Sequence, residues 1–233
     1  MATKSSVTDV VTEADRAVER FVIDVLAAAR PGDAVLGEET GQSRPSGRTR
    51  WILDPIDGTV NYLYGLPAYA VALAAEVDGV VVAGAVYNPV SGQEWTAVRD
   101  GGAYLAGERL TGSQVTELSQ ALVATGFGYS ADRRAHQAAV LAEVLPRVRD
   151  IRRIGAAALD LCLAAAGRVD AFFEKGLNRW DHAAAGLVAT EAGLVVSGLS
   201  GAPPGPDMVV AAPPQIHGAL HDLLVANDAA GGP

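Results

Sequence analysis

The sequence has a single cysteine, no long apolar run and no excess of positive charge, and each shortage excludes a class of protein. Cys162 cannot form an internal disulfide, which agrees with a reducing compartment. Apolar residues make up 49% of the chain, but no run reaches the roughly 18 positions that a membrane-spanning helix needs. The first residues lack the apolar core of a secretory signal. We therefore expect a cytoplasmic protein that makes no membrane contact.

The balance of charge excludes most binders of nucleic acid. The chain has 27 Asp and Glu residues against 18 Lys and Arg residues, for a net charge of −9. A protein that displaces counterions from a phosphate backbone needs clustered Lys and Arg. We interpret part of the acidic excess as a metal site, while most of the carboxylates serve solubility.

The first 120 residues predict helices on an antiparallel sheet. Thr12-Glu13-Ala14-Asp15 is typical of a helix start, and the apolar residues at positions 18, 21, 22, 25 and 26 predict an amphipathic helix over residues 12–29. Strands are predicted at residues 34–36, 51–53, 68–76, 80–86, 94–98 and 103–105. Asp78-Gly79 is a strong hairpin signal, because both residues tolerate positive φ.

From about residue 121 the sequence predicts strands that alternate with helices, which is typical of an α/β arrangement. The predicted helices cover residues 131–148, 156–166, 181–192 and 214–226, and strands lie between them. No linker separates the two regions. We expect one packed unit over residues 1–233, made of a helix and antiparallel-sheet half (1–120) and an α/β half (121–233).

The segment from Trp51 to Thr59 carries the strongest chemical signal. Asp54 and Asp57 follow an apolar strand, and Pro55 restricts the turn between them so that both carboxylates can face one side. Close carboxylates repel unless a cation lies between them, and oxygen ligands without Cys or His suit Mg²⁺ rather than zinc. Gly58 and Thr59 offer backbone N–H groups to a phosphate at a predicted helix start. The alternative is that Asp-Pro and Asp-Gly are ordinary turn dipeptides.

Three motifs together resemble the inositol monophosphatases of the lithium-sensitive, Mg²⁺-dependent phosphatase superfamily. They are Gly37-Glu38-Glu39, the segment Trp51-Ile52-Leu53-Asp54-Pro55-Ile56-Asp57-Gly58-Thr59, and Trp180-Asp181-His182-Ala183-Ala184-Ala185-Gly186 with the later Glu191-Ala192-Gly193. The similarity extends over nearly the whole chain and is greatest to actinobacterial members. The resemblance implies a layered α+β or α/β fold, an αβαβα sandwich, and a homodimer.

The resemblance also implies a cofactor and a metal site. It assigns two or three Mg²⁺ ions to a site whose first metal binds Glu38, Asp54 and the carbonyl of Ile56, and whose second binds Asp54, Asp57 and Asp181. Thr59 and Glu38 would orient the attacking water, with Asp15 as the hydrogen-bond partner of Thr59. The metal would lower the pKa of that water, so no covalent nucleophile is needed.

The substrate side is implied in the same way. Gly58 and Thr59 would bind the phosphate, Glu174 would bind substrate hydroxyls, and Gly155-Ala156 would lie beside the ring, with Asp57 and Asp181 also at the substrate. Many members have Thr or Ser where this chain has Ala156, so one polar contact is expected to be absent. Members also carry a helix before the position of Lys4, so we expect either a misassigned start or a protein without that helix.

Some neighbouring residues have weaker signals. Arg152 and Arg153 could steer an anionic substrate, although one of them could instead pair with a surface carboxylate. His182 follows Asp181 directly, and neighbours on a helix point apart, so we expect it at the rim of the site rather than on a cation.

The leading hypothesis is Mg²⁺-dependent hydrolysis of myo-inositol monophosphate to myo-inositol and phosphate, with inhibition by Li⁺. Alternatives keep the chemistry but change the substrate to histidinol phosphate, fructose 1,6-bisphosphate, 3′-phosphoadenosine phosphate or NADP. A further alternative, from another class, is a non-catalytic regulatory binding partner.

Overall fold

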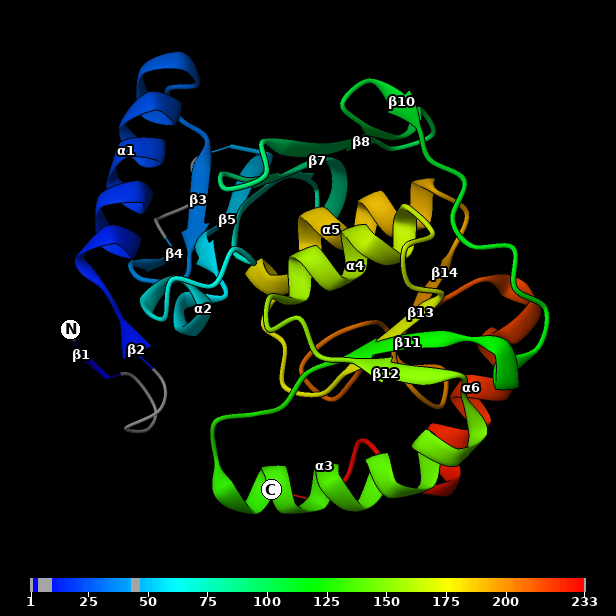
Figure 1. Cartoon of the computed structure of the whole chain (residues 1–233). Helices are drawn as coiled ribbons and strands as arrows, with labels where there is room; N and C mark the ends of the chain where they lie inside the picture. Colours follow the sequence, from blue (N-terminus) through cyan, green and yellow to red (C-terminus); the bar gives the residue numbers. More distant parts are fainter. Residues whose placement is uncertain (1, 4–9, 43–46, 233) are drawn as a thin grey trace.

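A computed structural model describes residues 2–3, 10–42 and 47–232, and its elements form five layers (Figure 1). Helix α1 (Glu13–Ala29) covers one face of a large sheet, and α4 (Ala157–Ala165) and α5 (Arg179–Glu191) cover its other face. A smaller sheet follows, and α3 (Ala131–Val144) and α6 (Pro214–Ala226) cover its far side. The αβαβα sandwich implied by the resemblance is therefore confirmed.

The large sheet has eight strands in the order β10-β9-β8-β7-β6-β5-β3-β4. Their bounds are β3 (Ala34–Gly37), β4 (Gly41–Gln42), β5 (Thr49–Asp57), β6 (Ala70–Val77), β7 (Val80–Asn88), β8 (Gln93–Val98), β9 (Gly102–Leu105) and β10 (Glu108–Arg109). Only β3 and β5 pair in parallel. The predicted hairpin at Asp78-Gly79 is present, and both residues have positive φ. Outside this sheet, β1 (Ala2–Thr3) pairs with β2 (Val10–Val11).

The small sheet has five strands in the order β12-β11-β13-β15-β14. Their bounds are β11 (Leu122–Thr125), β12 (Asp150–Arg152), β13 (Ala171–Glu174), β14 (Val195–Ser197) and β15 (Val209–Ala212). Alternate residues face opposite layers, as the period of a strand requires. Phe172 packs towards α4 and α5, whereas Phe173 packs towards α3 and α6.

The main core lies between the two sheets and is built around α4 and α5. Although α5 lies in the chain between β13 and β14 of the small sheet, it packs across strands β5 to β9 of the large sheet. Gly84 on β7 permits this close approach, because a Cβ atom there would lie 2.8 Å from the carbonyl oxygen of Ala184. Residues of the second half are thereby brought against the strand that carries Asp54.

Helix α1 begins as predicted, but only part of its predicted apolar stripe is buried: Leu26 is, whereas Phe21 and Val25 are not. The Thr12 side chain accepts hydrogen bonds from the backbone N–H groups of Ala14 and Asp15, which caps the helix. Phe21 is 68% exposed and Val25 51% exposed, whereas Asp15 and Glu19 are completely buried. The helix therefore directs a carboxylate pair, spaced i and i+4, at the sheet.

One further departure from the prediction concerns the end of a helix. The predicted helix 131–148 ends at Val144, and a 3₁₀ turn, η2 (Leu145–Arg147), continues it because Pro146 cannot donate a backbone hydrogen bond. The other short 3₁₀ turn is η1 (Leu118–Gln120), and α2 (Thr59–Leu63) follows β5. In the described part of the chain, every helix is too short or too polar to cross a bilayer.

Candidate active site

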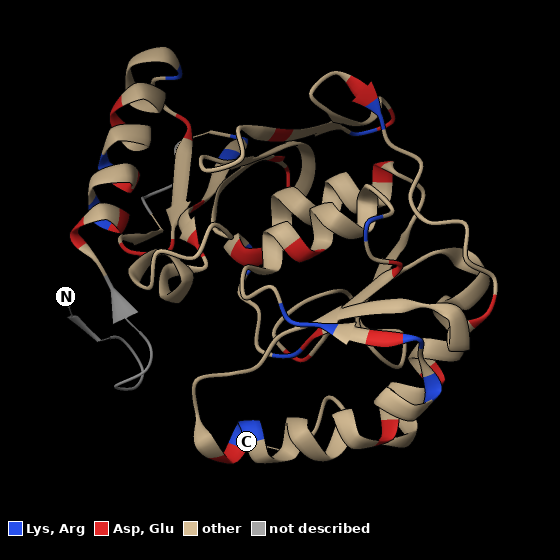
Figure 2. Cartoon of the chain, viewed as in Figure 1, with Lys and Arg blue, Asp and Glu red and all other residues tan. Residues whose placement is uncertain are grey.

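A cavity of about 840 Å³ opens where the end of β5, the start of α5 and the end of β13 meet. Of the catalytic, metal-binding and substrate-binding residues that the resemblance implies, all but Asp15 line it. The lining set includes Glu38, Asp54, Ile56, Asp57, Gly58, Thr59, Gly155, Ala156, Glu174 and Asp181. Figure 2 shows acidic residues at the end of β5 and at the start of α5 on the same side of the molecule. The tertiary structure thus gathers residues that lie up to 143 positions apart, from Glu38 to Asp181.

The end of β5 places two carboxylates on one face through a bulge. Asp54 pairs with Ala72 and Asp57 with Ala70, so β5 has one more residue than β6 between these two points. Residues three apart on a regular strand face opposite sides, and the extra residue restores a common side. Pro55 lies inside the bulge, where its missing N–H group breaks no ladder bond.

Glu38 enters the cavity from a tight turn. Residues Glu38, Glu39 and Thr40 connect β3 to β4, whose last and first residues, Gly37 and Gly41, pair directly. The backbone N–H of Glu38 donates to the carbonyl of Leu53 at 3.2 Å. The turn is therefore fixed to β5 one residue before Asp54.

Asp181 comes from the other half of the chain, in the first turn of α5. Its Oδ2 atom accepts a 2.6 Å hydrogen bond from the backbone N–H of Asn178, so the carboxylate also caps the helix. Because α5 packs on the large sheet, its first turn lies at the same cavity wall as Asp54 and Asp57.

The crowded carboxyl groups raise one another's pKa. Burial raises the pKa of Asp54 well above its usual value, and the charges of Glu38, Asp57 and Asp181 raise it further. Burial also raises the pKa of Asp57 to about 7, although backbone N–H groups of Ala158 and Ala157 oppose the rise. Asp181 keeps part of its surface open to the cavity, yet burial and the charge of Asp57 raise its pKa well above the usual range. A cation among these groups would relieve the repulsion.

The donor atoms fit a hard divalent cation. They are carboxylate oxygens and the carbonyl oxygen of Ile56, without sulfur or imidazole, which is the ligand chemistry of Mg²⁺. As the side chains stand, no three acidic, His or Cys groups of the described residues surround a point as a bound ion requires. Their oxygens are instead turned to backbone N–H groups, those of Ile56, Ala157, Ala158 and Asn178. Rotation of the carboxylates is therefore needed for ligation.

Thr59 links the cavity to α1. Its hydroxyl oxygen lies 3.2 Å from Oδ1 of Asp15 and 3.1 Å from the carbonyl oxygen of Ile56. A single hydroxyl proton can serve either acceptor, while the hydroxyl lone pairs stay available to a water molecule in the cavity. The sequence-based pairing of Asp15 with Thr59 is present in the structure.

Gly58, Gly155 and Ala156 form a close contact beside the carboxylates. Gly58 has φ of 89°, and a Cβ atom there would lie 3.1 Å from Cβ of Ala156 and 3.2 Å from the carbonyl oxygen of Gly155. Only glycine meets both demands. The amide of Asn61 donates to the carbonyl oxygens of Ala68 and Ile154 and so fixes this contact.

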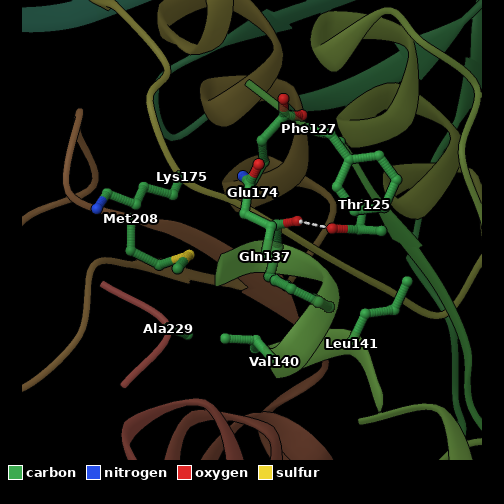
Figure 3. A pocket seen from close by; sticks show the side chains of 11 residues that line it. Thr125, Phe127, Gln137, Val140, Leu141, Glu174, Lys175, Met208 and Ala229 are labelled. Atoms are coloured by element: carbon green, nitrogen blue, oxygen red, sulfur yellow. Dashed lines mark hydrogen bonds between the residues drawn. The ribbon is translucent and has the colours of Figure 1, made fainter. Parts of the chain in front are cut away.

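Glu174 ends β13 at the opposite wall of the cavity. Burial raises its pKa to about 8, while Arg153 acts to lower it. A narrow second pocket of about 10 Å³, room for one water molecule, lies beside it between Phe127, Gln137 and Met208 (Figure 3). Glu174 therefore faces both the main cavity and this pocket.

The structure separates the two arginines and corrects the prediction for His182. Arg152 pairs with Asp150 on the surface at 2.6 Å, whereas Arg153 lines the cavity. His182 does not lie at the rim: it is 4% exposed, and burial lowers its pKa to about 4. The tight packing of α5 between the sheets explains this burial. Lys4, before which family members carry a further helix, falls outside the described residues.

Two buried carboxyl groups were missed by the sequence analysis. Asp160 on α4 is 1% exposed, and its Oδ1 atom has no hydrogen-bond partner. Glu19 on α1 is completely buried and accepts hydrogen bonds from the turn that carries Glu38. An acidic residue at an expected inward position of a helix, four residues after Asp15, was the available signal for Glu19.

Comparisons with known proteins agree over most of the chain. Residues 1–229 match the model of the inositol monophosphatase family. The inositol-1-monophosphatase SuhB of Mycobacterium tuberculosis is 53% identical over 202 residues, which are 83% of this chain and 70% of that protein. The Nus factor SuhB of Escherichia coli is 39% identical over 202 residues, 86% of this chain and 76% of that protein. The solved structure of Mycobacterium tuberculosis SuhB superposes with a TM-score of 0.83 at 48% identity, covering 93% of this chain and 85% of that one.

Proposed function

Because this chain belongs to the inositol monophosphatase family and is a metal-dependent phosphoric monoester hydrolase, we propose that its substrate is myo-inositol monophosphate and its metal Mg²⁺. The products are myo-inositol and phosphate. The observation that carries the proposal is the convergence of Glu38, Asp54, Asp57 and Asp181, from three separate segments, on one cavity.

We assign the carboxylates of Glu38, Asp54, Asp57 and Asp181 and the carbonyl of Ile56 to the binding of Mg²⁺, in two or three ions. The Ile56 carbonyl has a second lone pair free beyond its contact with the Thr59 hydroxyl. When bound, Mg²⁺ supplies positive charge that lowers the pKa of a water ligand and stabilises negative charge on the phosphate and the leaving oxygen.

The remaining groups orient water and substrate. Glu38 and the Thr59 hydroxyl hold the attacking water, and Asp15 fixes the hydroxyl at 3.2 Å. The backbone N–H groups of Gly58 and Thr59 face the phosphate. Attack on phosphorus breaks the bond to the inositol oxygen, which then takes up a proton, while Glu38 accepts a proton from the water.

We assign recognition of the polyol to Glu174, Gly155 and Ala156, with Asp57 and Asp181 reaching the substrate from the metal side. Glu174 and Arg153 offer both an acceptor and a donor for ring hydroxyls. Ala156 has no hydroxyl, so this part of the ring contacts only an apolar surface. The arrangement favours a polyhydroxyl ligand over a purine.

Phosphate release from a metal-stripped preparation tests the proposal. We expect turnover of myo-inositol 1-phosphate that requires added Mg²⁺ and is inhibited by Li⁺. Activity that survives complete metal removal would contradict the mechanism. A panel with histidinol phosphate, fructose 1,6-bisphosphate, 3′-phosphoadenosine phosphate and NADP tests the substrate, and a higher kcat/KM for any of these overturns the choice of inositol.

A second candidate, a non-catalytic regulatory role, draws its support from the likeness to the Nus factor SuhB. The retention of every acidic position favours catalysis over this alternative. An Asp54→Asn variant that is inactive yet restores the phenotype of a deletion strain would support the regulatory role. The homodimer also remains a proposal, which sedimentation velocity tests.

A further inference from the structure

Helix α1 packs on β5 of the large sheet (Figure 1), and two of its carboxylates, those of Asp15 and Glu19, are completely buried. The Asp15 carboxylate already has a partner at the site in Thr59. Glu19, one turn later, contacts neither the cavity nor any residue that we assign to catalysis. A completely buried carboxylate is costly unless it is hydrogen-bonded, so its partners indicate its role.

Both oxygens of Glu19 bind the turn that carries Glu38. Oε2 accepts from the backbone N–H of Glu39 at 2.9 Å, and Oε1 accepts from the backbone N–H of Thr40 at 2.8 Å. With the bond from the Glu38 N–H to the Leu53 carbonyl, three successive N–H groups of the turn are held. Hydrogen bonds to an ionised acceptor are among the stronger ones in proteins.

Gly37 completes the contact. A Cβ atom at this position would lie 2.6 Å from Cδ of Glu19 and 2.7 Å from each of its oxygens. Its φ is not positive, so the backbone would accept another residue. The Glu19 carboxylate is therefore what excludes a side chain here, and the family motif Gly37-Glu38-Glu39 has its glycine where the carboxylate needs room.

We propose that Glu19 is a positioning residue for the metal site: by binding the Glu39 and Thr40 N–H groups, it holds Glu38 at the angle needed to bind Mg²⁺. The inference rests on the proposed function, because Glu38 is assigned there as a ligand. Groups that orient metal ligands commonly change metal affinity by 10- to 100-fold when altered.

Two variants disturb the contact from opposite sides. Glu19→Gln keeps the shape but presents an NH₂ group to one of the two N–H donors, and it removes the negative charge. Gly37→Ala keeps the charge and pushes the carboxylate away from the turn. We expect each to raise the Mg²⁺ dissociation constant about 10-fold, measured by calorimetry on metal-stripped protein without substrate. The KM for inositol phosphate at saturating Mg²⁺ should change less than about twofold.

Asp170→Asn is the matched control, because Asp170 also accepts from a backbone N–H, that of Leu122 at 2.6 Å, and from the hydroxyl of Ser113. It lies in the second half, away from the cavity lining. We expect it to lower thermal stability without changing the Mg²⁺ dissociation constant. The double variant Glu19→Gln/Gly37→Ala should weaken Mg²⁺ binding by less than the product of the two single effects, since both act on one contact.

The outcomes are separable. Unchanged Mg²⁺ affinity in folded Glu19→Gln and Gly37→Ala would make Glu19 a stabilising residue only and overturn the inference. If Mg²⁺ affinity falls in Glu19→Gln but not in Gly37→Ala, the effect comes from the charge of Glu19, and the proposed positioning role is also overturned. If Glu19→Gln does not fold, Gly37→Ala decides by itself. The Asp54→Asn variant, measured in the same experiment, tests the proposed function independently. If its Mg²⁺ binding is unchanged, the assignment of the metal site to these carboxylates is wrong.

Discussion

The two walls of the cavity hold buried carboxyl groups in different ways. On the wall built from β5 and the start of α5, Asp54, Asp57 and Asp181 each accept backbone N–H groups. On the wall built from β13 and α4, Glu174 lies near Arg153, and Asp160 of α4 is buried outside the cavity lining. Carboxyl groups that repel one another gain from a cation between them, whereas a carboxyl group beside an arginine offers an acceptor and a donor to hydroxyl groups.

Burial raises the pKa of the carboxyl groups in both places, but the charged groups around them differ. Asp160 has its pKa raised to about 9 by burial and by the charges of Glu174 and Asp57, against the influence of Arg153. Asp54 and Asp181 have only carboxylates as charged neighbours that shift their pKa. The two walls therefore differ in the charged groups that act on their carboxyl groups: other carboxylates on the first wall and Arg153 on the second.

The largest effect is expected from substitutions in the wall built from β5 and the start of α5, to which we assign Mg²⁺ and which we call the metal wall. Asp54→Asn and Asp181→Asn should each reduce kcat by about 10³-fold or more, because each removes a charged ligand and so weakens the binding of the Mg²⁺ that the reaction needs. Phosphate release at saturating substrate measures this. Asp78→Asn on the exposed β6–β7 hairpin is the isosteric control and should keep full activity. Near-normal rates in the first two variants would remove the metal assignment.

The metal-free protein should become less stable as the pH rises. Burial raises the pKa of Asp57 from 3.8 to about 7, so the folded state binds this proton more tightly than the unfolded chain. The contribution of this proton to the free energy of unfolding is at most about 4 kcal/mol. It is complete below about pH 4 and is lost as the pH rises to about 7.

Denaturant titrations between pH 4 and 9 measure this trend. For Glu174 the corresponding window runs from its usual 4.5 to about 8. Asp57→Asn and Glu174→Gln should each flatten the part of the curve in its own window. Added Mg²⁺ should flatten only the Asp57 part, because it binds the ionised form. Equal flattening of both windows by Mg²⁺ would contradict the division between the two walls.

A substitution in the wall built from β13 and α4, to which we assign the substrate hydroxyls, should weaken substrate binding and leave Mg²⁺ binding unchanged. Glu174→Ala is expected to raise the KM for inositol phosphate about 10- to 50-fold, the value of about two hydrogen bonds, with Mg²⁺ affinity unchanged. Gly126→Ala offers a second test, because a Cβ atom there would collide with the Glu174 carboxylate. A weakened Mg²⁺ affinity without a change in KM would place Glu174 on the metal wall instead.

The smallest effect concerns the packing that brings the walls together. Gly84→Ala would place a Cβ atom 3.0 Å from Cα of Ala184, so α5 must shift, at a cost of about 1–2 kcal/mol in the free energy of unfolding. Gly186→Ala, on α5 itself, meets no atom within 4 Å and should stabilise by about 0.5–1 kcal/mol. Chemical denaturation measures both, and equal stabilities would show that Gly84 does not limit the approach of α5.

Local features of the fold were predictable because short-range chemistry fixes them. The Thr12 cap, the Asp78-Gly79 turn and the strand that carries Asp54 each depend on a few adjacent residues. The inward face of α1 was predictable only in part, since Leu26 is buried as expected, whereas Phe21 is exposed and Glu19 is buried. A pattern of apolar residues cannot reveal that backbone N–H groups of another segment require a carboxylate partner.

The sequence by itself determined the chemical character of this protein, because the three acidic motifs and their neighbours are readable in one dimension. Only the tertiary structure decided how these motifs cooperate: the β5 bulge turns Asp54 and Asp57 to one side, and α5 crosses the large sheet to deliver Asp181. It also separated Arg153 from Arg152 and placed Glu19 beneath Glu38. Such relations depend on contacts between residues far apart in the chain, which packing fixes and local preference does not.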